Sequence, residues 1–202
     1  MTGRIELRDV AKSYGAGRLS RRVVEDCSFT VAPGEVTVMI GPSGVGKSTI
    51  VRLIAGFERP TDGEVLIDGR PVRRPGPDRL VVFQETALFP WMTTRENILY
   101  GPKARGEGGE ASRRRAAGLL DRVGLAAFQA RYPAQLSGGM QRRAELARAM
   151  INDPAVMILD EPFRGLDAMT KKLMLEYYLG LYEASRRTSL FITTDIDEAI
   201  VL

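Results

Sequence analysis

A glycine-lined loop in the first quarter of the chain constrains the fold more than any other feature. The loop, Gly41-Pro-Ser-Gly-Val-Gly-Lys-Ser-Thr49, follows the nearly continuous apolar run Val36 to Ile40 and precedes the apolar stretch Ile50 to Phe57. The run is typical of a buried parallel strand, and the stretch after the loop favours a helix. Strand, glycine turn and helix in this order predict a phosphate-binding loop in an α/β domain. A glycine turn with a chance lysine is the alternative, and the flanking elements argue against it.

The residue types in this loop suit a triphosphate. Its glycines let consecutive backbone N–H groups turn inward around phosphate oxygens. Lys47 can reach the β- and γ-phosphates, the Ser48 hydroxyl can ligate Mg²⁺, and the positive end of the following helix points at the same anion. The residues expected to line the loop are Gly41, Pro42, Ser43, Gly44, Val45, Gly46, Lys47, Ser48 and Thr49.

Two adjacent carboxylates supply what a phosphate loop still needs. Asp160 and Glu161 follow the apolar run Ala155 to Leu159, which predicts another buried strand. Neighbouring carboxylates at a strand end repel each other, so their presence suggests paired roles. We expect Asp160 to hold Mg²⁺ and Glu161 to polarise the attacking water. A solvated turn is the alternative.

A third signal is Leu136-Ser-Gly-Gly-Met-Gln141. Ser137 fits a helix N-cap, and Gly138 and Gly139 leave the amides of the first turn bare. Those amides predict a second anion site. Ser-Gly-Gly is a common cap by itself, so this motif gains weight only beside the loop and the acid pair.

The remaining pattern predicts an α/β fold with a mostly parallel sheet, an antiparallel edge and a helical insertion. Residues 84–103 carry turn residues and few strong periodicities, so no separate helix is delimited there. We expect one domain, with residues 1–94 and 152–202 as its core and residues 95–151 as a helical subdomain. Further strands are expected at residues 4–8, 23–31, 64–68, 80–83 and 189–193, and helices at 113–123, 140–151 and 173–184.

Composition removes several classes of function. The 202 residues include no histidine and one cysteine, Cys27. Histidine-based catalysis, histidine metal ligation, cysteine-cluster zinc sites and internal disulfides are therefore excluded. The net charge of +4 comes from scattered basic pairs, which indicate solvated faces more than a nucleic-acid stripe. No apolar run approaches the ~18 residues of a membrane span, and a cytoplasmic protein is expected.

Together these motifs resemble the nucleotide-binding subunit of an ATP-binding cassette (ABC) transporter, and the resemblance covers nearly the whole chain. Gly41 to Thr49 matches the Walker A loop, and Leu136 to Gln141 is similar to the family signature. Leu159 to Pro162 is similar to Walker B with its catalytic glutamate. Gly165-Leu-Asp167 resembles the D-loop, and Val82-Phe-Gln-Glu85 resembles the Q-loop.

The resemblance implies roles for single residues. It places Lys47, Gln84, Glu161 and Thr194 at the reacting phosphate, and Ser48, Gln84 and Asp160 around Mg²⁺. Tyr14 matches the aromatic residue that stacks on adenine, although it could instead pack at a strand end. The other residues implied to touch ATP are those of the loop together with Ser137, Gly138, Gly139, Gln141 and Asp167.

The resemblance also implies partners. Two such domains pair head to tail, each ATP lies between the Walker A loop of one and the signature of the other, and closure drives membrane permease subunits. The region with Leu88, Phe89 and Trp91 would grip a permease helix; the alternative is that Phe89 and Trp91 pack internally. The implied location is the inner face of the membrane, with a solute-binding protein as an indirect partner and no nucleic acid. The amino-acid sequence of several segments is most similar to that of importers of nitrate, sulfonates and taurine.

Four features depart from the family pattern. Thr194 stands where the family has a switch histidine, Met140 and Arg142 replace glutamines of the signature region, and Arg164 is unusual before the D-loop. The family also continues with a further strand and helices where this chain stops at Leu202, so a shortened C-terminal part is expected. These features leave open a nucleotide-binding module that hydrolyses ATP slowly. A soluble ABC ATPase that serves nucleic acid ranks lower, because the chain has no second cassette.

Overall fold

Two compact units make up the described chain, residues 2–202 of the computed structural model. The sheet unit runs from the first described residue to Val81 and adds Ala155–Glu161 and Arg186–Leu202. The helical unit comprises Val82–Pro154 and Pro162–Ser185. The phosphate loop and the acid pair therefore belong to the first unit, and the Ser-Gly-Gly motif belongs to the second.

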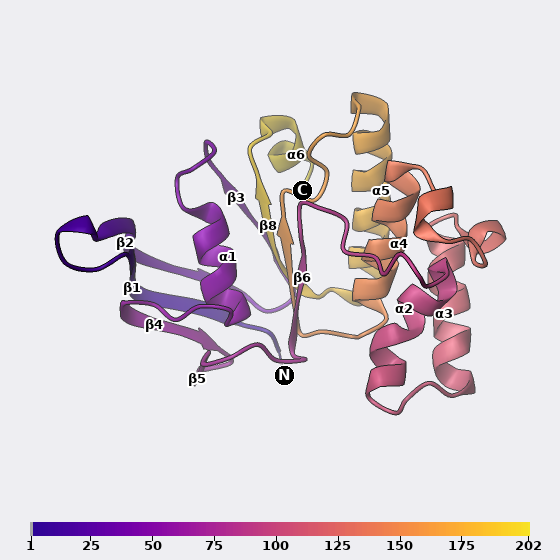
Figure 1. Cartoon of the computed structure of the whole chain (residues 1–202), viewed down its shortest axis with the longest axis horizontal. Coiled ribbons are helices and arrows are strands. Elements are labelled where there is room, and N and C mark those ends of the chain that lie inside the picture. The colour runs from indigo at the N-terminus through magenta and orange to yellow at the C-terminus, as the bar shows by residue number, and fades with distance from the viewer. Residues whose placement is uncertain (1) are drawn as a thin grey trace. The chain divides into compact units, whose positions relative to one another are not determined.

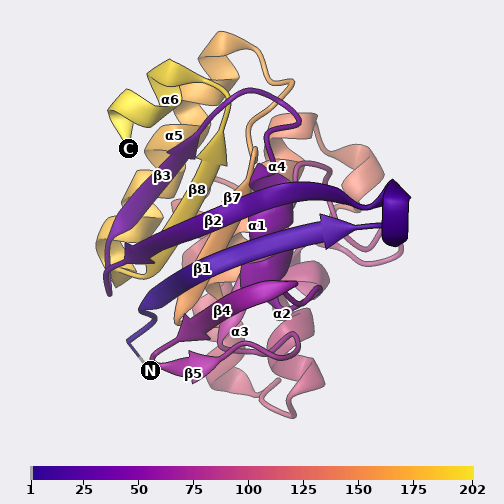
Figure 2. The same cartoon turned by 90° about the vertical axis from the view of Figure 1, so that its left-hand side faces the viewer.

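An antiparallel sheet forms one layer of the sheet unit. Its strand order is β2 (Arg21–Val31), β1 (Ile5–Tyr14), β4 (Asp62–Ile67) and β5 (Arg70–Pro71). Figure 2 shows this sheet face on, in front of helix α1. Asp68 and Gly69 both adopt positive φ, 50° and 72°, as a two-residue hairpin turn requires. The strand expected at residues 64–68 therefore lies in β4, which forms a hairpin with β5.

A parallel sheet carries the segments predicted to do chemistry. Its order is β3 (Val36–Ile40), β8 (Thr188–Thr193), β7 (Val156–Asp160) and β6 (Arg79–Val82). Strand β8 runs parallel to both β3 and β7. The carboxyl ends of these three strands therefore meet at one edge, which is where ligands bind in open α/β sheets.

Helix α1 (Lys47–Ala55) lies between the two sheets of this unit (Figure 1). Its apolar side packs in one core with residues from β1, β2, β4, β7 and β8, so that Leu53 and Ile54 are fully buried. The helix ends at Gly56 in the left-handed conformation, a usual helix stop. The packing of α1 in this core fixes the start of the helix, and with it the phosphate loop. A last short helix, α6 (Ile196–Val201), begins after its N-cap Asp195.

The helical unit is built from four helices that lie side by side (Figure 1). They are α2 (Thr94–Ala104), α3 (Glu110–Arg122), α4 (Gly138–Met150) and α5 (Ala168–Ser185). Short 3₁₀ turns lie at Gly17–Leu19 in the sheet unit and at Ala126–Phe128 and Pro133–Gln135 in this one. Among the described residues, no helix is both long enough and apolar enough to cross a bilayer.

Helix α2 occupies the second half of residues 84–103, where the weak periodicity of the sequence delimited no separate helix. The signal was a capping box: the Thr93 hydroxyl accepts from the Glu96 N–H, and the Glu96 carboxylate accepts from the Thr93 N–H. A weak helical periodicity and Pro102 inside the helix masked this signal. The predicted α/β class, with a parallel sheet and an antiparallel sheet, is confirmed.

Candidate nucleotide-binding site

The phosphate loop has a backbone that glycine alone accepts at two positions. Gly44 and Gly46 adopt φ of 83° and 105°, where side chains bring strain. A Cβ on Gly46 would also lie 3.0 Å from the carbonyl oxygen of Val23. The N-cap Gly46 offers no side chain to the start of α1, so the amides of Lys47 and Ser48 suit an anion, while the Thr49 N–H donates to the carbonyl oxygen of Gly46. The loop therefore fits the phosphate cradle that the sequence predicts.

Lys47 is held inside the loop. Its side chain is 6% exposed, and its Nζ donates to the carbonyl oxygens of Gly41 at 2.7 Å and Pro42 at 2.9 Å. The same Nζ lies 3.6 Å from Oε1 of Glu161, which is also buried. The ammonium group thus sits between the loop and the acid pair, where it can balance negative charge on either side.

Asp160 ends β7 beside Ser48. Burial raises the pKa of the Asp160 carboxyl above its ordinary value, and the charge of Glu161 acts in the same direction. A hydrogen bond with Ser48 and the charge of Lys47 oppose that shift. Carboxylate and hydroxyl oxygens are ligands that Mg²⁺ accepts. A partly desolvated carboxyl beside a hydroxyl at a phosphate loop therefore fits Mg²⁺ in its chemistry.

Glu161 has an unusual backbone for a residue other than glycine. Its φ is 46°, and its N–H donates to the carbonyl oxygen of Ile192 on β8 at 2.9 Å. Strained backbone of this kind persists where the surrounding structure holds it, and it is frequent at functional sites. The bond to β8 fixes where the Glu161 side chain leaves the sheet.

Thr194 follows β8 at the same edge of the sheet and is exposed. The residue before it, Thr193, is buried and donates its hydroxyl to Oε2 of Glu198 at 2.5 Å. The Asp195 N–H donates to the Thr193 hydroxyl at 2.9 Å. These bonds fix the backbone on both sides of Thr194. Because β3, β7 and β8 are parallel, the structure places Lys47, Ser48, Asp160, Glu161 and Thr194 along one edge of the sheet unit.

Tyr14 lies at the end of β1 and is partly buried. Its hydroxyl donates to Oε2 of Glu58 at 2.6 Å, and the Lys12 ammonium lies 5.1 Å from its ring centroid. The Tyr14 hydrogen bond, followed by contacts from Lys12, lowers the pKa of Glu58. The ring is therefore fixed in place, and stacking on adenine stays a prediction.

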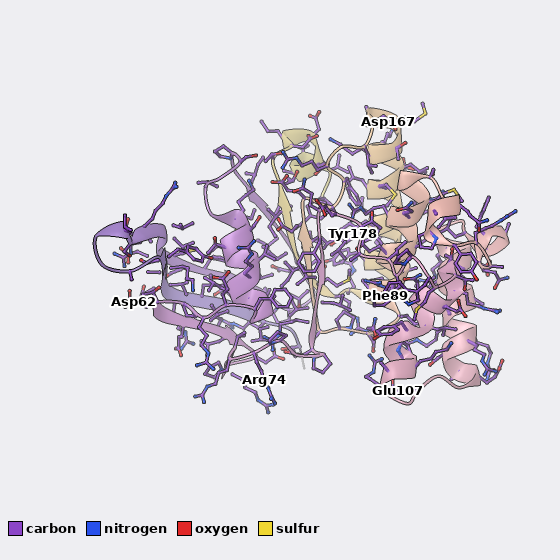
Figure 3. The ribbon with its side chains drawn as sticks, viewed as in Figure 1. Asp62, Arg74, Phe89, Glu107, Asp167 and Tyr178 are labelled. Carbon is purple, nitrogen blue, oxygen red and sulfur yellow. The ribbon has the colours of Figure 1, made fainter. Side chains whose placement is uncertain are left out.

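The signature and D-loop residues share a hollow of about 330 Å³ in the helical unit. Ser137 caps α4 by accepting from the Met140 N–H, as its position predicts. Asp167 lies at the beginning of α5 (Figure 3) and accepts from the Thr170 N–H at 3.0 Å. Hydrogen bonds from Thr170 lower the pKa of Asp167. The hollow is lined by Ser137, Gly138, Gly139, Met140, Arg143, Gly165, Leu166, Asp167, Thr170, Leu173 and Met174.

Gln141 and Gln84 are engaged in contacts within the helical unit. The Gln141 amide donates to the carbonyl oxygens of Pro133 and Leu136, so it supports the segment that precedes the signature. Gln84 has an exposed side chain, while its carbonyl oxygen accepts from Arg142.

The contacts of Arg142 with its helix neighbour Glu145 were not predicted from the sequence. Opposite charges three residues apart on one face of a helix were the available signal.

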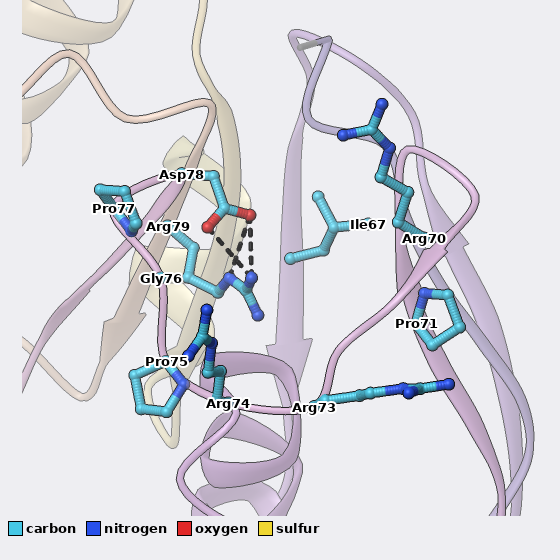
Figure 4. A pocket seen from close by; sticks show the side chains of 10 residues that line it. All are labelled: Ile67, Arg70, Pro71, Arg73, Arg74, Pro75, Gly76, Pro77, Asp78 and Arg79. Carbon is cyan, nitrogen blue, oxygen red and sulfur yellow. Dashed lines mark hydrogen bonds and ion pairs between the residues drawn. The ribbon is translucent and has the colours of Figure 1, made fainter.

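A second hollow, of about 560 Å³, lies in the sheet unit and is strongly basic (Figure 4). Arg70, Arg73 and Arg74 line it, and the Asp78 carboxylate pairs with Arg79 at 2.9 Å. Three further guanidinium groups thus share the wall of a hollow whose acid is already paired. No pattern in the sequence predicted it.

A glycine cradle with its lysine, followed by a buried strand that ends in a carboxylate beside the cradle's hydroxyl, defines a P-loop nucleoside triphosphatase. Residues 24–164 match the family model described as ABC transporter. The chain belongs to the ABC transporter family.

Curated relatives match over most of their length. The nitrate import ATP-binding protein NrtD of Synechococcus elongatus is 44% identical over the whole chain and 74% of the relative. The bicarbonate transport ATP-binding protein CmpD of Synechocystis is 43% identical over the whole chain and 72% of the relative. The taurine import ATP-binding protein TauB of Burkholderia pseudomallei is 40% identical over 96% of the chain and 75% of the relative.

A solved structure has the same fold. It is the dimeric post-hydrolysis state of the ATP-binding cassette MJ0796 bound to ADP and Pi. Its TM-score is 0.84 at 31% identity, over 98% of this chain and 90% of that one. The predicted P-loop core of an ABC cassette is therefore confirmed.

Proposed function

We propose that this chain binds and hydrolyses ATP as the energy-coupling subunit of an ABC importer for a small anionic solute. One observation carries the proposal. Within the sheet unit, Lys47 lies 3.6 Å from Glu161, and Asp160 is hydrogen-bonded with Ser48 at the start of the same helix. A phosphate-binding cation, two metal-binding oxygens and a carboxylate base are thus assembled at one strand edge, which is the set that phosphoryl transfer to water needs.

Each group has a separate task in the proposed reaction. The loop amides and Lys47 bind the β- and γ-phosphates and balance the charge that develops on them. Glu161 orients the attacking water and accepts its proton. Ser48 and Asp160, with Gln84 as the family resemblance implies, would hold Mg²⁺, which would supply charge stabilisation at the phosphates. Thr194 offers a hydroxyl to the γ-phosphate, and Tyr14 stacks on the base.

The second half of the site comes from another copy of the chain in this proposal. Ser137, Gly138, Gly139, Gln141 and Asp167 of one copy cover the ATP held by the loop of the other. The start of α4 supports this, because the amides that precede the capped Met140 N–H in its first turn suit a phosphate group. The dimeric state of the similar cassette MJ0796 supports it as well. The half-sites would then act in pairs, since catalysis here depends on positioning.

The transport role and the solute class are proposed from the relatives. Their names specify import of nitrate and taurine and transport of bicarbonate, all small solutes that carry a negative charge. We infer permease subunits as the direct partners, with the chain on the inner face of the membrane, and a solute-binding protein as an indirect partner. The exposed Trp91 and the neighbouring Phe89 are proposed to contact the permease.

The test measures ATP binding and phosphate release for the wild type, Lys47→Ala and Glu161→Gln. We expect Lys47→Ala to lose binding, and Glu161→Gln to keep binding and lose roughly 100-fold or more in turnover. Co-purification with a membrane permease tests the transport role. Nucleotide binding that is unchanged by Lys47→Ala would contradict the assignment of the site, and capture of nucleic acid in place of a permease would contradict the importer.

A further inference from the structure

The segment of residues 83–93 contains no helix or strand, although it follows β6 directly and includes Gln84. Backbone N–H and C=O groups that lack a ladder must find other partners. In this segment many of the partners are side chains, beside backbone bonds such as that from the Met92 N–H to the carbonyl oxygen of Phe89. Two helices of the same unit supply these side chains, α4 through charged residues and α2 through the buried Asn97.

Arg142 and Glu145 of α4 contact the start of the segment. Arg142 donates through Nη1 to the carbonyl oxygen of Phe83 at 2.7 Å and through Nη2 to that of Gln84. The same guanidinium lies 2.5 Å from Oε2 of Glu145. The other carboxylate oxygen of Glu145 accepts from the Ala87 N–H at 3.0 Å. The pair thus holds the backbone on both sides of residues 85 and 86.

Arg148 extends the same helix face. It lies three residues after Glu145, donates to the carbonyl oxygen of Ala87 at 2.8 Å and covers the Phe89 ring at 5.1 Å. Figure 3 shows Phe89 beside α2 and α4. The segment is therefore attached to α4 at several consecutive points.

The Arg142–Glu145 pair is almost fully removed from water. The exposed fractions of the two side chains are 6% and 4%. Burial raises the pKa of the Glu145 carboxyl, while the charge of Arg142 opposes that shift. Replacing a buried ion pair by apolar side chains often leaves stability unchanged or raises it. Stability alone is therefore a weak reason for the pair, and its contacts suggest a reason of position.

We propose that Arg142 and Glu145 are positioning residues for ATP hydrolysis, which hold residues 83–87, and with them Gln84, on the helix that begins at the signature. This inference rests on the proposed function of Gln84 and Ser137. The backbone of Gln84 is fixed while its side chain stays exposed, so the pair sets the starting point of the side chain without touching substrate. A movement of α4 would move that starting point with it.

The test replaces the pair by apolar side chains of similar size, Arg142→Met with Glu145→Leu. This double variant avoids an unpaired buried charge, which a single replacement would leave. The matched control is Glu110→Gln with Arg113→Gln, an ion pair of the same spacing on α3 whose side chains are 67% and 66% exposed. Glu145→Gln is the conservative variant for turnover: its amide oxygen can still accept from the Ala87 N–H, and the cost of leaving the Arg142 charge unpaired is expected in stability.

Three readouts separate positioning from mere support of the fold. We expect the double variant to keep its melting temperature and its ATP dissociation constant within about threefold, and to lose roughly 10- to 100-fold in kcat. Hydrogen exchange at the Ala87 amide should be at least about tenfold faster. Glu145→Gln should retain most of the turnover, and the control pair should match the wild type.

The last measurement is a mutant cycle that combines the Arg142→Met, Glu145→Leu variant with Gln84→Ala. If the pair acts through Gln84, the double variant lowers kcat in the wild type but not in the Gln84→Ala background. Equal losses in both backgrounds, or unchanged turnover with a faster Ala87 amide, would overturn the inference. A wild type that hydrolyses no ATP, or whose turnover survives Lys47→Ala, would instead mean that the proposed function has failed.

Discussion

Asp160 illustrates at the scale of one residue how a requirement of the proposed chemistry opposes folding. The carboxyl must be ionised to hold a cation, yet burial raises its pKa and so disfavours the ionised form. The bond with Ser48 and the charge of Lys47 recover part of that cost. A bound cation would recover more, so the site gains its full stability with its ligand present.

Asp160→Asn is therefore expected to be more stable than the wild type at pH 7 and to have roughly 100-fold lower turnover. Because the pKa of Asp160 is raised in the folded chain, protonated Asp160 stabilises the fold. This stabilisation is fully present below the ordinary pKa of 3.8 and is lost as pH rises through the folded pKa. Asparagine carries no such loss. Thermal melts from pH 3 to pH 8 should show the two curves converge at the acid end; a variant less stable at pH 7 would contradict this reading.

Thr194 carries a second prediction at this scale. A threonine can bond a phosphate oxygen but cannot place positive charge beside it, so we expect slow hydrolysis with normal ATP binding. Thr194→His should raise kcat by roughly 100-fold, the scale of one positioned contact to a developing charge. Phosphate release and nucleotide titration are measured side by side, with Thr193 left unchanged because its hydroxyl bonds Glu198. A histidine variant with no gain in kcat would show that the threonine is sufficient.

At the scale of elements, the chain holds an irregular segment in place by dedicated side chains. Asn97 of α2 is fully buried and donates to the carbonyl oxygens of Phe89, Met92 and Thr93, while its own oxygen accepts from the Phe89 N–H. One side chain thus replaces what a strand ladder would give. The exposed aromatic residues beside it are then presented on a fixed backbone.

Asn97→Ala is expected to cost about 3 kcal/mol, because it leaves several buried backbone groups without partners. Chemical unfolding measures the loss, and Gln129→Ala, which truncates an exposed polar side chain of the same unit, is the matched control. A cost near that of the control would mean that water replaces the amide.

The sequence indicated the sheets and the phosphate loop well because their signals are local. Apolar runs mark β3, β7 and β8, and the spacing of Gly41, Gly46 and Lys47 is fixed by the ligand that it suits. Helix α2 was not delimited as a separate helix of the expected helical subdomain, because its signal lies in a cap and not in an apolar stripe. The bonds of Arg142 and Glu145 join residues about 58 positions apart, and no local pattern reveals a bond of that separation.

At the scale of the whole molecule, the modest net charge of +4 conceals an uneven distribution. Arg70, Arg73 and Arg74 line one hollow of the sheet unit, and Arg79 uses the nearby acid Asp78 (Figure 4). Like charges that share a hollow repel one another, and salt screens that repulsion.

Arg73→Ser with Arg74→Ser is therefore expected to raise the melting temperature by about 1–2 °C at low ionic strength. The gain should vanish near 1 M salt, where the screening length falls to about 3 Å. Arg113→Ser with Arg114→Ser, on α3, is the control. A lower melting temperature for the first variant at both salt concentrations would show that the aliphatic stems of the two arginines contribute packing that outweighs the repulsion.

Cys27 on β2 makes the chain convenient for site-specific labelling. It is the sole thiol of the sequence, it is partly buried, and burial raises its pKa, so little thiolate is present near neutral pH. A cysteine introduced at an exposed surface position should therefore react first with a maleimide dye or a nitroxide. The natural chain is thus already close to a single-label background for fluorescence or spin-resonance spectroscopy.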